Sequence, residues 1–207
     1  MRFSCDTSDL NSSLSVVSRA LAVRSPKPIL EGILFESCDE GLRLTCTDLA
    51  LGIETTIPAT FIDEGRAVLP GKLFTELVRK LPGGTVTIKV NENHSASIRC
   101  MNSKSNLAGM NPMEYPEMAE VDKGVEVKIP QNKLKEMISR VVFAIATDES
   151  RQILTGCLLE VNQAEARLVA LDGFRLAMQK VFQPFQLPAG QETLKAVIPG
   201  RVLNELS

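Results

Sequence analysis

The chain has 207 residues, of which 44% are hydrophobic and 23% are charged, and its formal net charge is −2 at pH 7. This length allows one or two domains with proper cores, and the small negative charge offers no general argument for binding nucleic acid. No apolar run approaches the roughly 18 residues of a membrane span, and the N-terminus lacks the apolar stretch of a signal peptide, so we expect a cytoplasmic protein without membrane contact.

The first half of the chain begins with a predicted amphipathic helix over residues 8–24. Its apolar side chains recur at spacings of four, three and four residues, at Leu10, Leu14, Val17 and Leu21. Side-chain oxygens that can cap the first turn stand at Thr7, Ser8 and Asp9. Strand patterns follow in five segments, which are 29–36, 42–47, 51–57, 85–90 and 96–101.

A second helix is predicted over residues 71–81, between the third and fourth of these strands. Pro70 and Gly71 open this helix, and Pro82 ends it. One side of it carries Leu73, Leu77 and Leu81, with Phe74 and Val78 adjoining. Two helices and several antiparallel strands together indicate an α+β layer.

The second half of the chain shows the same succession of patterns. Apolar and charged side chains alternate over residues 125–129, which predicts a strand. The helix predicted over 131–146 carries an apolar stripe of Leu134, Ile138, Val141 and Ile145. Further strand patterns lead to a second Pro-Gly helix start, at Pro199 and Gly200.

Repeated phrases indicate that the two halves are copies of one unit. AVLPGKLFTEL (67–77) and AVIPGRVLNEL (196–206) share six identities at an offset of 129, and ILEGILFE (29–36) and ILTGCLLE (153–160) share five at 124. Asp48 stands opposite Asp172 at 124, and VSR (17–19) stands opposite ISR (138–140) at 121. We therefore predict a complete domain over residues 1–120 and a second over 121–207 that lacks its last strands, as in a fragment of a longer protein.

The predicted helices are basic although the whole chain is slightly acidic. Residues 8–24, 71–81 and 131–146 hold eight basic and three acidic side chains, a sum of +5 that leaves −7 on the rest of the chain. Solvation of a polar helix face explains any one of these lysines by itself. Their segregation favours helices that face a polyanion through weak, sequence-independent contacts.

No pattern in the sequence indicates catalysis, a cofactor or a metal site. GxGxxG, Walker A, HExxH and GxSxG motifs are absent, the five cysteines lack metal-ligand spacing and read as buried thiols, and His94 is expected in a surface loop. Asp48 and Asp172 could form a carboxylate pair for acid–base chemistry. Their recurrence at the same place in each copy favours a role in capping a turn. We therefore expect a protein that is not an enzyme.

Six segments together resemble the bacterial sliding clamp family, the beta subunit of DNA polymerase III: KPILEGILFE, TDLAL, AVLPGKLFTEL, VFAIATDESRQILTGCLLEV, LDGFRLA and VIPGRVLNEL. The resemblance runs in order from residue 1 to residue 207. It implies repeated clamp domains of α+β class, each with two helices on curved antiparallel sheets. It also implies a third such domain, which we expect this chain to lack, and a homodimeric ring in the full-length protein.

The resemblance further implies a processivity factor in DNA replication. In such a role the ring encircles duplex DNA without regard to sequence, and an ATP-driven clamp loader places it there. The implied partners are the polymerase III catalytic subunit, the loader and other proteins that carry a clamp-binding motif. The alternative is a tandem α+β repeat module that binds peptides and has no role on DNA.

Seven residues are predicted to contact DNA. Arg24 and Lys72 match DNA-contacting positions of the family, and Arg201 repeats Lys72. Arg79 and Arg140 join them from the charge pattern, seven residues after Lys72 and Lys133 respectively. Gln152 and Ile153 hold positions where some members of the family present DNA-contacting tyrosines, and this departure argues against a stacking or wedge role there.

A hydrophobic cleft that receives partner peptides is the second site that the resemblance implies. Its wall from the second domain matches seven residues: Leu154, Thr155, Leu171, Gly173, Phe174, Arg175 and Leu176. Aliphatic side chains would desolvate a partner's Leu or Phe, and Gly173 would permit close backbone approach. Without the resemblance, the three leucines fit an ordinary strand core better. The other wall would belong to the third domain.

Overall fold

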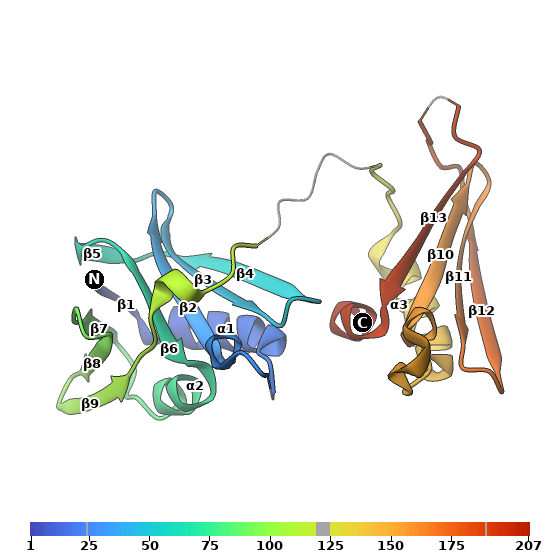
Figure 1. The fold of residues 1–207 in the computed structure, drawn as a ribbon. Coiled ribbons are helices and arrows are strands. Elements are labelled where there is room, and N and C mark those ends of the chain that lie inside the picture. The colour runs from blue at the N-terminus through green and yellow to red at the C-terminus, as the bar shows by residue number, and fades with distance from the viewer. Residues whose placement is uncertain (24, 119–124, 189) are drawn as a thin grey trace. The chain divides into compact units, whose positions relative to one another are not determined.

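The computed structural model describes residues 1–23, 25–118, 125–188 and 190–207. The chain divides into two compact units, unit 1 over Met1–Ala119 and unit 2 over Glu120–Ser207 (Figure 1). Both units combine helices with antiparallel sheets, which confirms the predicted fold class. Within the described ranges, no helix is long and apolar enough to cross a membrane. The predicted boundary at residue 120 and the predicted DNA contact Arg24 lie outside those ranges.

Unit 1 contains two antiparallel sheets. The first has five strands in the order β5-β1-β7-β8-β9, with bounds Thr60–Asp63, Arg2–Asp6, Thr85–Val90, Ser95–Cys100 and Ser103–Ala108. The second has four strands in the order β4-β3-β2-β6, with bounds Gly52–Ile57, Gly41–Thr47, Gly32–Cys38 and Arg66–Pro70. Strands β1, β5 and β9 were not predicted, because each is only four to six residues long and carries few apolar side chains.

Helix α1 (Thr7–Val17) of unit 1 continues into a 3₁₀ turn, η1 (Ser18–Ala20). Leu10, Leu14 and Val17 of the predicted stripe are fully buried. The predicted capping residues were wrong by one position, since the helix begins after Asp6. The Asp6 carboxylate accepts a hydrogen bond from the backbone N–H of Ser8 at 2.7 Å and satisfies one of the free donors of the first turn.

Leu77 of helix α2 (Gly71–Arg79) and Leu81 just after it pack against the core as predicted, but the buried side of the helix is centred on Phe74 and Val78 rather than on the leucines. Phe74 and Val78 are buried, whereas Leu73 is 57% exposed. The cause is an aromatic contact, in which the Phe74 ring meets the Phe35 ring of β2 edge-on with centroids 5.2 Å apart. Phe35 also stacks on Phe3 of β1, so one core joins both sheets to both helices.

Unit 2 contains one described sheet with helices on one side of it (Figure 1). The strand order is β12-β11-β10-β13, with bounds Leu176–Phe182, Glu165–Leu171, Gly156–Asn162 and Thr193–Pro199. The helical segments are α3 (Gln131–Val141), η4 (Val142–Ala144), η5 (Glu149–Thr155) and α4 (Gly200–Leu206). Met137, Ile138 and Val141 of α3 pack in the core with Cys157 and Leu168 of the sheet.

Residues 125–129 do not form the predicted strand. The corresponding strand of unit 1, β1, is held between β5 and β7. No strand in the described part of unit 2 pairs with residues 125–129, so their backbone groups have no ladder to join. Val127 and Ile129 nevertheless pack against the core of unit 2, which explains the apolar alternation.

The two units repeat each other's packing at the Pro-Gly helix starts. Gly32 pairs with Pro70 in unit 1, and Gly156 pairs with Pro199 in unit 2. A Cβ atom on Gly71 would lie 3.0 Å from the carbonyl oxygen of Glu31, and one on Gly200 would lie 2.9 Å from that of Thr155. Glycine is needed at both helix starts because a backbone carbonyl approaches so closely.

The repeat offset between the first helices of the units is 124. Thr7–Val17 and Gln131–Val141 bury corresponding residues, Leu14 with Ile138 and Val17 with Val141. The alignment of VSR with ISR at 121 was therefore wrong by three residues, close to one helical turn. A shift of about one turn leaves apolar residues aligned on the same side of the helix, so a match of three residues cannot reveal it.

Residues 109–118 of unit 1, which include a 3₁₀ turn η3 (Pro112–Glu114), cross the outer face of the β4-β3-β2-β6 sheet. Met110 bridges to Val68, and the buried Tyr115 donates its hydroxyl proton to the carbonyl oxygen of Thr45 at 3.2 Å. This crossing segment buries Leu34 and Val68. The residue of unit 2 that corresponds to Val68 is Val197, which is 46% exposed because no described segment crosses that face.

Candidate nucleic-acid interface and peptide cleft

Helix α2 presents two cations on the face opposite its buried side. Lys72 lies in the first turn and Arg79 in the last, seven residues apart, so both project on one side of the helix. Phe74 and Val78 hold the opposite side against the core. Both cations are exposed, and neither forms an ion pair within the described residues of the chain. The structure therefore leaves these charges available to an anion.

Helix α3 presents Lys133 and Arg140 in the same seven-residue relation. Unlike the cations of α2, both are engaged by one carboxylate, since Glu136 lies 2.8 Å from Arg140 and 3.9 Å from Lys133. Arg201 is the second residue of α4, as Lys72 is of α2, and is half-buried. Each unit thus carries basic residues on its own helices.

Gln152 and Ile153 lie in the 3₁₀ segment η5 rather than on a helix face. Both side chains are exposed, and Ile153 is 70% exposed. The neighbouring Thr155 is half-buried and donates its hydroxyl proton to the carbonyl oxygen of Gln152 at 2.7 Å. This hydrogen bond closes the last turn of η5, in which Gln152 and Ile153 lie.

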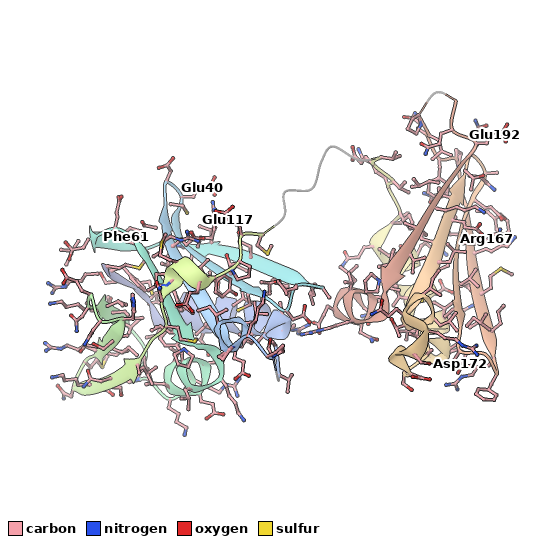
Figure 2. The ribbon with its side chains drawn as sticks, viewed as in Figure 1. Glu40, Phe61, Glu117, Arg167, Asp172 and Glu192 are labelled. Atoms are coloured by element: carbon pink, nitrogen blue, oxygen red, sulfur yellow. The ribbon has the colours of Figure 1, made fainter. Side chains whose placement is uncertain are left out.

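A hollow of about 300 Å³ lies at one end of the unit 2 sheet, between η5 and the β11–β12 turn. Figure 2 labels Asp172 at this end of the sheet. The lining residues are Ala146, Asp148, Ser150, Arg151, Leu154, Asp172, Gly173 and Phe174. The structure therefore brings together three residues of the predicted peptide site, Leu154, Gly173 and Phe174.

The floor of the hollow is a turn held by the Asp172 carboxylate. Its Oδ1 atom accepts the backbone N–H of Phe174 at 2.9 Å and that of Arg175 at 3.0 Å. These bonds hold the pKa of the Asp172 carboxyl below its ordinary value. Gly173 has φ +96°, a left-handed conformation in which a side chain would be strained. Phe174 is consequently presented to solvent, fully exposed.

Asp48 of unit 1 builds the same turn. Its Oδ1 atom accepts the backbone N–H of Ala50 at 3.0 Å and that of Leu51 at 2.7 Å. The prediction that Asp48 and Asp172 cap turns is confirmed, and the two carboxylates serve separate units. Leu49 takes the place of Gly173 and has φ +76°, so unit 1 bears strain where unit 2 has a glycine.

The remaining predicted cleft residues lie at the rim of the same turn. Leu171 and Leu176 pair across the last rung of β11 and β12 and are 39% and 62% exposed, so they are not buried strand-core residues. Arg175 donates from Nε to Asp172 at 2.8 Å, and its guanidinium lies 5.6 Å from the centre of the Phe143 ring. Apolar, cationic and acidic groups thus surround the hollow.

Sequence reasoning missed Phe143, Asp148 and Arg151 at this site. All three fall within the segment VFAIATDESRQILTGCLLEV, which resembles the family without assigning these residues a role. Spacing alone does not show that the chain turns as a 3₁₀ segment after Asp148, whose carboxylate accepts the backbone N–H of Ser150 at 2.9 Å. That turn brings Arg151 to within 4.0 Å of the position that a Cβ on Gly173 would occupy.

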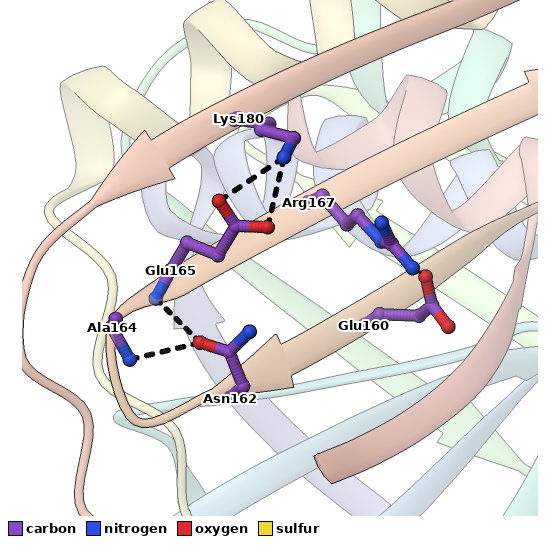
Figure 3. A network of polar contacts seen from close by, with 6 residues as sticks. All are labelled: Glu160, Asn162, Ala164, Glu165, Arg167 and Lys180. Atoms are coloured by element: carbon purple, nitrogen blue, oxygen red, sulfur yellow. Dashed lines mark hydrogen bonds and ion pairs between the residues drawn. The ribbon is translucent and has the colours of Figure 1, made fainter.

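The face of the unit 2 sheet away from the helices carries an ion-pair network (Figure 3). Glu160 of β10 is paired with Arg167 of β11 and with Lys195 of β13, the latter at 2.9 Å. Hydrogen bonds from these two cations lower the pKa of Glu160 to about 2. Lys180 of β12 pairs separately with Glu165 of β11 at 2.9 Å, so ion pairs on this face involve all four strands. Unit 1 repeats part of it at Glu36.

Comparison with known proteins gives matches over almost the whole chain. Residues 1–119 match the family model described as DNA polymerase III beta subunit, N-terminal domain, and residues 128–207 match that of the central domain. The beta sliding clamp of Halalkalibacterium halodurans is 37% identical and that of Bacillus subtilis 35% identical, each over 100% of this chain and 56% of the relative. The chain spans about half the length of these curated relatives.

Solved structures agree with these matches. The crystal structure of the DNA polymerase sliding clamp from Bacillus subtilis superimposes with a TM-score of 0.91 at 35% identity, over 100% of this chain and 56% of that one. The fold of the chain is therefore that of solved sliding clamps over the matched length.

Proposed function

Because the chain belongs to the family of the DNA polymerase III beta subunit, we propose that the protein is a DNA sliding clamp that holds the replicative polymerase on its template. In the intact protein we place a third copy of the unit and a homodimeric ring around duplex DNA. The observation that carries the proposal is the segregation of exposed cations onto helices in an acidic chain. A ring holds DNA by enclosure, so its wall needs only weak contacts.

The helix cations supply those contacts in the proposed mechanism. Lys72 and Arg79 of α2 reach phosphate oxygens of the duplex, and Arg201 does so from the corresponding helix start of unit 2. Contacts to phosphates carry no sequence information, so the clamp remains free to move along any duplex. Lys72 and Arg79 are exposed and Arg201 is half-buried. Salt screens all three contacts, so none holds the DNA for long.

The hollow at the end of the unit 2 sheet is the proposed site for partner peptides. Leu171 and Leu176 offer exposed aliphatic surface beside it, and the half-buried Leu154 lines it. This apolar surface suits an apolar anchor of a short motif. The proposed ligands are segments of the polymerase III catalytic subunit, the clamp loader and other clamp-binding proteins. Part of the cleft is supplied by another domain of the intact protein.

The proposed role involves no chemistry by the clamp itself. The two carboxylates that recur in the units, Asp48 and Asp172, are committed to turns. The described residues contain no group of three His, Cys, Asp or Glu side chains that could hold a metal ion. The energy for opening the ring is assigned to the ATP-driven loader.

Charge reversal on α2 tests the DNA-facing assignment. We expect Lys72→Glu combined with Arg79→Glu in the intact protein to reduce its retention on DNA several-fold and to flatten the salt dependence of that retention. The matched control is Lys89→Glu, an exposed lysine on strand β7 rather than on a helix. Equal losses in the two variants, or no loss in either, would show that α2 does not face the DNA.

A further inference from the structure

Glu136 lies between two cations on the exposed face of α3. Its Oε1 atom is 2.8 Å from Nη2 of Arg140, and its Oε2 atom is 3.9 Å from Nζ of Lys133. Spacings of three and four residues place the three side chains on one stripe of the helix. The side chains are 39% to 59% exposed, so the stripe is open to a large anion.

The helix α2 of unit 1 carries a stripe of the same composition without these pairs. Glu76 stands between Lys72 and Arg79 in the chain and is likewise exposed. Among the described residues, none of the three forms an ion pair. The two helices thus differ in one respect that matters for a polyanion, which is whether their cations already have a carboxylate partner.

We propose that Glu136 is a positioning residue that holds Arg140 and Lys133 in intrahelical ion pairs and so limits how many phosphates α3 can contact. This inference rests on the proposed function and concerns the same DNA-facing surface. A phosphate that approaches Arg140 must displace the Glu136 carboxylate, whereas a phosphate that approaches Lys72 displaces only water and counterions.

Exposed ion pairs of this kind open readily, because the attraction is weak in water and the side chains lose rotamer freedom when they pair. Arg140 can therefore exchange between Glu136 and a passing phosphate. When the phosphate leaves, Arg140 pairs with Glu136 again. Such an exchange keeps the contact short-lived, which is what a clamp that slides requires.

Glu136→Gln removes the carboxylate charge and nearly preserves the shape of the side chain. We expect the full chain carrying this change to bind a labelled duplex of about 30 base pairs roughly two- to five-fold more tightly at about 50 mM salt. The salt slope is the decisive readout: log Kobs against log salt becomes steeper by about 1 for each cation released to a phosphate. Fluorescence anisotropy at several salt concentrations measures both quantities.

Glu76→Gln is the matched control, since it removes the same charge from a helix where no cation is paired. It should raise affinity slightly through net charge and leave the salt slope unchanged. Adding Arg140→Ala to Glu136→Gln should cancel most of the gain in slope, because the released cation is then missing. An unchanged melting temperature in each variant shows that folding is not the cause.

Two outcomes would overturn the inference, and they can be told apart. If Glu136→Gln and Glu76→Gln have the same salt slope while Arg140→Ala alone weakens binding, α3 faces DNA but Glu136 does not restrain its cations. If Arg140→Ala and Lys72→Glu both leave binding unchanged, the proposed DNA-facing surface fails as well.

Discussion

Gly71 and Gly200 occupy equivalent helix starts in the two units, and at both places a backbone carbonyl lies too close for a side chain. Each is buried at a helix start, and each faces the backbone carbonyl of a residue that precedes a paired strand. A methyl group at either place would force the helix start away from that carbonyl. The Pro-Gly phrase is conserved between the two units for this reason, independently of any contact with DNA.

Gly200→Ala should destabilise unit 2 by about 1–3 kcal/mol, because the added Cβ would lie 2.9 Å from the Thr155 oxygen and 2.8 Å from Cδ1 of Ile145. Chemical denaturation followed by circular dichroism measures this loss. Gly83→Ala is the control, since a Cβ there would meet nothing within 4 Å. A Gly200→Ala variant as stable as the control would refute the packing argument.

Leu176→Ala in the intact protein should weaken binding of a partner motif by about 1–3 kcal/mol, since it removes exposed aliphatic surface beside the hollow. Calorimetric titration of a clamp-binding peptide measures the change. Phe182, at the other end of β12 and 75% exposed, provides the control Phe182→Ala. Equal effects of the two substitutions would place the peptide site elsewhere.

At the scale of elements, sequence patterns predicted both long helices and the strands with clean alternation. These predictions succeeded because a side that faces the core repeats its apolar side chains every 3.6 residues in a helix and every second residue in a strand. Strand β9, SKSNLA, was missed because an edge strand with one face in water needs few apolar residues. The exposure of Leu73 on α2 was not predicted, because the leucine spacing does not reveal the Phe74–Phe35 contact that turns Phe74 toward the core.

The candidate sites were predictable to different degrees for related reasons. Lys72 and Arg79 lie on the face that helical periodicity predicts, so the charge pattern located them. The hollow was not predictable from pattern, because it depends on a 3₁₀ turn at Asp148 and a left-handed Gly173 that bring distant segments together. Only the resemblance to a known family indicated its residues.

The ion-pair network on the unit 2 sheet predicts a pH dependence. The pKa of Glu160 falls from its ordinary value of 4.5 to about 2 in the folded protein, so its contribution to stability is complete above pH 4.5 and is lost as the pH falls toward 2. Glu160→Gln should therefore be less stable than the native protein at pH 7, with a difference that shrinks below pH 4.5.

Denaturant titrations at several pH values test this expectation. The control is Glu126→Gln, because among the described residues Glu126 pairs only with Lys128, and both side chains are more than three-quarters exposed. A stability difference for Glu160→Gln that persists unchanged at pH 3 would show that its ion pairs do not stabilise the sheet.

At the scale of the whole molecule, the charge distribution and the repeated unit both support the proposed sliding-clamp role. Two units of the same fold each present basic side chains from a helix layer, while the chain as a whole is acidic. In the proposed role, weakly basic helices in an acidic protein suit a ring that surrounds DNA without adhering to it. In the proposed role, the hollow in unit 2 gives partner peptides a place to bind.

The most direct test of the sliding-clamp assignment compares retention on closed and open DNA. The intact protein is loaded onto nicked circular duplex by a clamp loader, separated from free protein by gel filtration, and the circle is then cut once. We predict that the protein stays with the circle at salt concentrations that abolish ordinary binding, and that it leaves after the cut. Equal loss from circular and linear DNA would contradict the account.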